Sequence, residues 1–290
     1  MKTRLTLAIL LLLALFVTAC QAPGAPVPQD PLEAVKAIAD KQTEVKTQHI
    51  AVNLALSLKL DGLTGDQAQA AALFKNFKAE ANVSGDVDTA KQDVALTGDL
   101  DLGPLTAFIA QGEEKLLFEL VKVGDKMYVK ANVGETANEW QEQAVPQPAT
   151  AESKDNPLNP EMITDLLKQS SKAEKLADEK IGEVDTYHYK VTLNPETLID
   201  SVAKLAQSTG SSGAVDEAQL TEAKKYLKDS VLEVELWAGK QDLLMRQTKV
   251  HFNLNLKDLP DMPGATALVD FLLTYTLTKL NEPVTITAPK

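Results

Sequence analysis

Cysteine is almost absent from this chain: Cys20 is the only one in 290 residues. A single thiol excludes a disulfide within the chain and any metal site built from several cysteines. Whatever folds must therefore be held together by an apolar core. The chain is long enough to bury a sizeable one, as one large domain or two small ones.

Histidine is also scarce, and the common catalytic motifs are missing. The three histidines, His49, His188 and His251, show no metal-ligand spacing such as His-x-x-x-His. Each lies out of phase with the apolar residues of its segment, which predicts a position on the polar face of a strand. The sequence has no glycine-rich phosphate loop, nucleophile elbow or calcium loop. We therefore expect no enzyme, no catalytic or metal-binding residue and no cofactor.

Long apolar runs are missing as well, except for one near the N-terminus. Leu5 to Val17 is apolar apart from Thr6 and follows Lys2 and Arg4. Its length suits a signal peptide and is too short to cross a hydrocarbon core of roughly 30 Å.

The apolar run ends in Val17-Thr18-Ala19-Cys20, which resembles the bacterial lipobox. Residues 1–20 are thus predicted to be a lipoprotein signal peptide, with Cys20 lipidated after cleavage. The alternative is an ordinary secretory signal with an incidental cysteine. The lipid would anchor the protein to the outer side of the cell membrane, or to an outer membrane if the organism has one.

The charge is strongly acidic, with 41 acidic against 29 basic side chains and a net charge of −12. This balance argues against nucleic acid as a partner held by charge. Residues 21–31 are rich in proline and alanine and are predicted to be a tether with a reach on the order of 30 Å. Residues 32–290 are then expected to form a single domain.

Apolar residues at every second position predict long strands. The segment His49 to Leu60 carries six such residues on one face. Similar alternation predicts strands at 79–87, 94–102, 116–123, 126–131, 186–193, 232–236, 244–256 and 271–277. Long alternating strands with short turns indicate an antiparallel sheet with one dry and one wet face.

Helices are expected beside these strands. Asp30-Pro31 is a typical helix start, and helical spacing or alanine-rich sequence indicates further helices near 66–74, 160–167, 195–205 and 216–228. The fold class predicted is therefore α+β: an antiparallel sheet with several helices covering its dry face.

Several segments together resemble a known family. They are Val45–Ile50, the Val123–Val129 hairpin, Trp140, the Gly182–Leu193 hairpin, the Leu236–Arg246 strand-turn-strand and Asn281–Pro289. In this order they resemble the LppX/LprAFG lipoproteins, relatives in fold of the lipoprotein carriers LolA and LolB. The resemblance implies a strongly curved half-barrel with helices in its concavity, and an apolar cavity for lipids or glycolipids.

The residues that would line this cavity are taken from the apolar face of the strands. They are Val52, Leu54, Leu56, Leu58, Val94, Leu96, Phe118, Leu120, Tyr189, Val191, Phe252, Leu254, Tyr275 and Leu277. Pattern alone fits a filled core equally well. The function expected is lipid binding, to carry or present the lipid. The alternative is a sensory, regulatory or structural envelope lipoprotein that acts through protein contacts, with a partner the sequence does not identify.

The anchor gives a first prediction. Cys20→Ala removes the thiol that would receive the lipid, so the variant should lose its partitioning into detergent and appear as uncleaved precursor or as released protein. Detergent phase separation of cell extracts measures this. A variant that still enters the detergent phase after loss of residues 1–19 would contradict lipidation at Cys20.

Overall fold

The computed structural model describes residues 26–63, 75–109, 112–134, 137–144, 167–168, 170, 172–193, 231–259 and 262–290. The expected signal peptide with Cys20 lies outside these residues. So do the helices expected at 66–74, 195–205 and 216–228, and the helix expected at 160–167 apart from Leu167.

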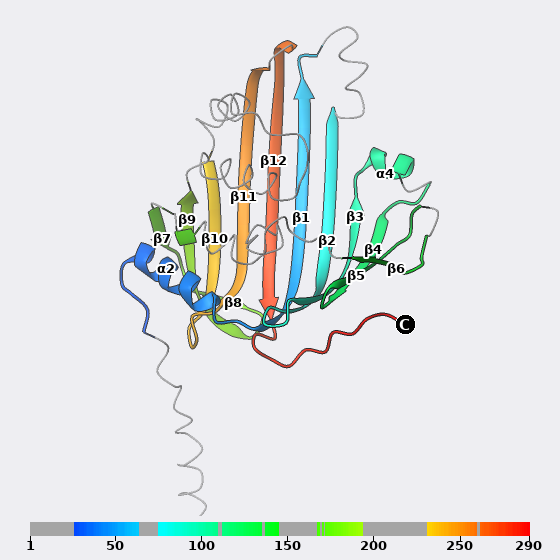
Figure 1. Cartoon of the computed structure of the whole chain (residues 1–290). Helices are drawn as coiled ribbons and strands as arrows, with labels where there is room; N and C mark the ends of the chain where they lie inside the picture. Colours follow the sequence, from blue (N-terminus) through cyan, green and yellow to red (C-terminus); the bar gives the residue numbers. More distant parts are fainter. Residues whose placement is uncertain are drawn as a thin grey trace, which may run out of the picture.

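One antiparallel sheet of 12 strands dominates the structure (Figure 1). Its strands are β1 (Thr47–Asp61), β2 (Asn76–Asp88), β3 (Asp93–Asp101), β4 (Leu116–Val123), β5 (Lys126–Ala131), β6 (Gln141–Ala144), β7 (Lys172–Lys175), β8 (Glu179–Ile181), β9 (Val184–Leu193), β10 (Val231–Gly239), β11 (Met245–Leu259) and β12 (Met262–Thr278). Their order is β6-β5-β4-β3-β2-β1-β12-β11-β10-β9-β7, with β8 paired to β9. The first and last strands of the chain are thus neighbours at the centre.

The prediction of an antiparallel sheet is confirmed, but the prediction of a strongly curved half-barrel needs correction. The described part of the chain is mostly β, and the sheet is neither closed nor strongly curled. Closure would require the edge strands β6 and β7 to pair, and they do not. β-Bulges are one source of strong curvature in a sheet. Here the pairing of β1 with β12 is unbroken from His49 to Asp61, and the bulges lie near strand ends.

The described residues form two helices, α2 (Pro31–Gln42) and α4 (Pro104–Ile109). The start of α2 is as predicted, since the Asp30 side chain accepts a hydrogen bond of 3.0 Å from the Glu33 N–H. The helix contacts β7 and β11 and lies across one end of the sheet (Figure 1). The short α4 was not predicted. Neither described helix is long and apolar enough to span a bilayer.

The core lies between α2 and the sheet. Ala34, Val35, Ile38 and Ala39, which share one side of α2, are fully buried in it. Val27, which belongs to the expected tether, also packs against this core. The last residues of that tether are therefore part of the folded domain.

The polar face of the sheet carries all three histidines, as predicted, but they differ in burial. His49 and His251 are partly or well exposed, and each lies 2.7 Å from a carboxylate, of Asp86 and Asp270 respectively. His188 is only 5% exposed. His188 thus lies on the polar face as predicted, but it is covered there by other side chains.

A stacked aromatic pair explains this burial. The His188 ring lies on the Trp237 ring with their centroids 4.2 Å apart, since the two residues are directly opposite on β9 and β10. Nε2 of His188 is 3.0 Å from the Glu235 carboxylate, and the Trp237 Nε1–H donates to Glu179 over 3.0 Å. His188 therefore joins the middle of β9 to β8 and β10.

Replacing this histidine gives a second prediction. His188→Gln removes the stacking and leaves the carboxylate of Glu235 without its ring partner, so it should lower the free energy of unfolding by about 1–3 kcal/mol. The matched change His251→Gln, on the exposed part of the same face, should cost no more than about 0.5 kcal/mol. Urea unfolding measures both. Equal effects of the two variants would contradict a structural role for His188.

Candidate functional site

The register of the strands joins the apolar residues of the sheet into continuous rows on one face. Leu54 of β1 is opposite Leu273 of β12, which is opposite Val250 of β11. The next rows follow in the same way: Leu56, Phe271 and Phe252, then Leu58, Val269 and Leu254, then Leu60, Ala267 and Leu256. We call this surface the apolar face. It is the candidate site.

All fourteen residues predicted to line a cavity lie on the apolar face. Val52 is opposite Val83 and Tyr275, Leu96 is opposite Gly85 and Leu120, and Val191 and Tyr189 are opposite Val234 and Leu236. The sheet therefore brings together side chains from β1, β3, β4, β9, β11 and β12. Whether they enclose a cavity stays a prediction.

Burial changes along the strands of this face. Near α2 the side chains are closely packed: Ile50 is 4% exposed, Leu277 1% and Leu236 fully buried. Farther along the same strands, Leu54, Leu56 and Leu58 are only half-buried. Their neighbours Phe252, Leu254, Val269, Phe271 and Leu273 are half-buried too. Among the described residues, the apolar face is thus closely packed beside α2 and half-buried along Leu54 to Leu58, although Ala79 and Phe77, opposite Leu56 and Leu58 on β2, are buried.

Two tyrosines mark the low polarity of this face. Burial raises the pKa of the Tyr189 hydroxyl to about 12, and burial alone raises the pKa of Tyr275 well above its ordinary value. Desolvation disfavours the charged phenolate, which is why both values rise. Both hydroxyls are therefore neutral at any physiological pH.

Two glycines, Gly85 on β2 and Gly98 on β3, allow groups of the neighbouring strand to lie close to the backbone. A side chain at Gly98 would meet the ring of Phe118 at 2.6 Å, so the ring of this predicted cavity residue lies over Gly98. A side chain at Gly85 would meet the Ala95 carbonyl oxygen at 1.9 Å. Large residues at either position would displace Leu96 or Phe118 from the apolar face.

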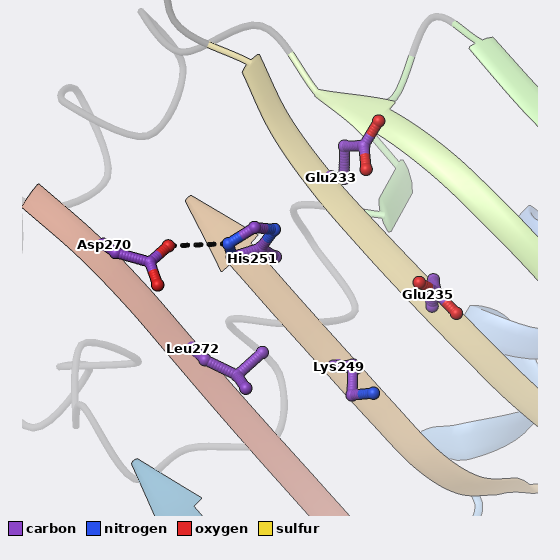
Figure 2. A pocket seen from close by; sticks show the side chains of 6 residues that line it. All are labelled: Glu233, Glu235, Lys249, His251, Asp270 and Leu272. Atoms are coloured by element: carbon purple, nitrogen blue, oxygen red, sulfur yellow. Dashed lines mark hydrogen bonds and ion pairs between the residues drawn. The ribbon is translucent and has the colours of Figure 1, made fainter. Parts of the chain in front are cut away.

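The opposite face has a hollow of a different character. It measures about 240 Å³ and is lined by Glu233, Glu235, Lys249, His251, Asp270 and Leu272, as Figure 2 shows. Most of its polar side chains have partners within the protein: His251 pairs with Asp270, Glu233 with Lys190 and Glu235 with His188. A hollow lined by polar and charged side chains does not suit acyl chains.

The positions of the possible ligands also bear on metal binding. Among the residues that the structure describes, no three histidine, cysteine, aspartate or glutamate side chains come together as a metal-ligand group.

Comparison with known proteins gives similarity in structure only. No protein-family model matches the chain, and no curated protein sequence matches it. Among solved structures, lipoprotein LppX from Mycobacterium tuberculosis is 15% identical, with 88% of this chain and 98% of LppX covered and a TM-score of 0.41. LprF from Mycobacterium bovis is 15% identical, with coverages of 90% and 99% and a TM-score of 0.44. The chain is thus similar in structure to members of the family that its sequence resembles.

Proposed function

We propose that this protein is an exported lipoprotein, anchored through Cys20 on the outer side of a membrane, that binds lipids or glycolipids and carries or presents them. The acyl chains would lie against the half-buried end of the apolar face. The observation that supports this most is the contrast along single strands, where Ile50 is closely packed and Leu54 to Leu58 are not. Apolar rows that stay partly exposed leave area for a ligand to cover.

The driving force would be the burial of methylene groups, worth about 0.8 kcal/mol each. Flexible acyl chains need contact area more than directed hydrogen bonds, and the rows from Leu54 to Leu60 offer aliphatic and phenylalanine side chains only. Binding of this kind needs no covalent step and no cofactor. The protein's contribution would be to shield chains that are insoluble in water.

The anchor would keep this surface near its lipid source. Cys20 precedes α2 by few residues, and α2 lies over the packed end of the apolar face. A lipid on Cys20 would therefore hold the domain close to the membrane. A sensory or structural role through protein contacts remains the alternative, and it predicts no lipid in the purified protein.

Tryptophan substitutions on the apolar face test lipid binding. Leu56→Trp and Leu254→Trp place a large ring where an acyl chain would lie, so they should reduce uptake of a fluorescent fatty acid severalfold. Because these positions are half-buried, the delipidated variants should melt close to the parent. Overfilling a packed core would instead typically cost about 1–3 kcal/mol.

Leu268→Trp is the matched control, since Leu268 is on β12 on the opposite face and is 38% exposed. It should change neither uptake nor melting. If the parent takes up no lipid and both apolar-face variants melt far below it, the face is a filled core and the structural alternative holds.

A further inference from the structure

The connection between β3 and β4 is apolar and partly exposed. Residues 102–112 carry no charged side chain, although charged residues make up 24% of the chain. Ile109, the last residue of α4, is 51% exposed, and Leu117, near the start of β4, is 52% exposed. An uncharged connection that leaves such large apolar side chains exposed indicates an interaction site.

The helix that carries Ile109 is fixed to the sheet. Thr106, in the same helix, is 1% exposed, and its hydroxyl oxygen accepts the Leu102 N–H over 2.7 Å. Gly103 lies so close to β2 that a side chain there would meet the Lys78 carbonyl oxygen at 2.9 Å. Ile109 is therefore held at the surface by a turn of helix that packs on the sheet, and it is not the tip of an unpacked loop.

One row of the apolar face leads to this connection. The row crosses β1, β2, β3 and β4, and each of its residues is opposite the next: Leu54, Ala81, Leu100 and Leu116. These four are half-buried, and so are Leu102 and Leu105, which follow β3. An acyl chain that enters at α4 would therefore meet apolar side chains all the way to the surface proposed for the ligand.

A lipid bilayer is the partner within reach of this connection. The anchor proposed at Cys20 precedes α2 by about ten residues, with a reach on the order of 30 Å. Such a tether keeps the bilayer at a high local concentration, so a weak second contact is enough. α2 and α4 lie on opposite sides of the sheet (Figure 1). The anchor beside α2 and a contact at α4 would together lay the domain along the bilayer.

Charges beside the connection select the kind of bilayer. Glu113 and Glu114 follow it directly and are exposed, whereas the Lys115 ammonium lies 2.7 Å from the Asp99 carboxylate. Exposed carboxylates repel anionic headgroups that lie within a Debye length. The connection therefore fits a bilayer of zwitterionic lipids better than an anionic one.

We propose that α4 and the start of β4 form a membrane-contact site, which inserts Ile109 and Leu117 into the surface of a zwitterionic bilayer and passes lipid to the apolar face. The proposal rests on the anchor and the lipid binding proposed above and adds the route by which the ligand enters. Burial of one such side chain favours contact about tenfold. The contact is therefore weak and reversible, as repeated transfer requires.

Tryptophan fluorescence of the lipidated protein tests the contact. The full protein is reconstituted through its own anchor into phosphatidylcholine vesicles, with or without bromine on the acyl chains. Ile109→Trp and Leu117→Trp should show blue-shifted emission that brominated lipid quenches far more than in the parent, which reports Trp140 and Trp237 alone. Replacing part of the lipid by phosphatidylglycerol should weaken this quenching.

Leu268→Trp is the matched control. Leu268 is exposed too, but it lies on β12 between Lys59 and Asn255, and β1, β2 and β3 separate β12 from β4. Brominated lipid should quench this variant no more than the parent. Because all three substituted positions are exposed, each variant should melt close to the parent.

Uptake of lipid from the bilayer tests the route. A fluorescent fatty acid is added to the vesicles, and its transfer to the reconstituted protein is followed with time. Ile109→Asp and Leu117→Asp each place a charge in the contact, so each should slow uptake about tenfold without changing the amount finally bound. Leu268→Asp should change neither the rate nor the amount.

Three results would overturn the inference. Emission at positions 109 and 117 that bromine quenches no more than in the parent removes the contact, and stronger quenching in anionic vesicles removes the choice of a zwitterionic surface. Uptake by both aspartate variants at the parental rate removes the route. None of these results affects the proposed function, which fails instead if the parent takes up no fatty acid. The route then fails with it, and quenching alone decides the contact.

Discussion

The pairing of β1 with strands on both sides is the constraint on which the rest of the structure depends. β1 pairs with β2 from Thr47 to Lys59 and with β12 from His49 to Asp61, without a break. Because side chains alternate between faces, a slip of one residue in either pairing would turn every apolar side chain of β1 to the polar face. This register aligns the leucines of β1 with Phe271 and Leu273, and through β12 with β11.

The same pairing explains why the sheet has a packed and an incompletely covered end. α2 enters directly before β1, and its buried side chains pack where Ile50, Leu277 and Leu236 meet. The strands continue well past the helix, because α2 lies across one end of the sheet (Figure 1), whereas the 15 residues of β1 extend roughly 50 Å away from that end. The apolar rows beyond Val52 are the consequence, and they carry the proposal of lipid binding.

Sequence reasoning predicted the local elements well. The alternation from His49 to Leu60 predicted β1 and the face it turns inward, and Asp30-Pro31 predicted the start of α2. The strands predicted at 116–123 and 126–131 form the β4–β5 hairpin, with Gly124 at φ 61° in its turn. These features depend on neighbouring residues only. Cysteine lipidation and the four helices expected beyond α2 concern residues outside the described part of the chain.

Features that depend on distant residues were harder to predict. Alternation placed the last long strand at 271–277, whereas β12 begins at Met262. Pairing with β1 extends it back to Thr266, and pairing of Leu259 with Met262 extends it to its first residue. The burial of His188 comes from Trp237 on another strand. The adjacency of the first and last long strands has no signature in the sequence, because it arises from pairing between segments far apart in the chain.

Native mass spectrometry of the protein, purified without organic solvent, tests the central claim most directly. If acyl chains cover the apolar face, part of the folded protein should carry adducts with the masses of lipids, and extraction with organic solvent should remove them. Folded protein that shows only the mass of the polypeptide and its own N-terminal modification, even after incubation with lipid vesicles, would contradict the account.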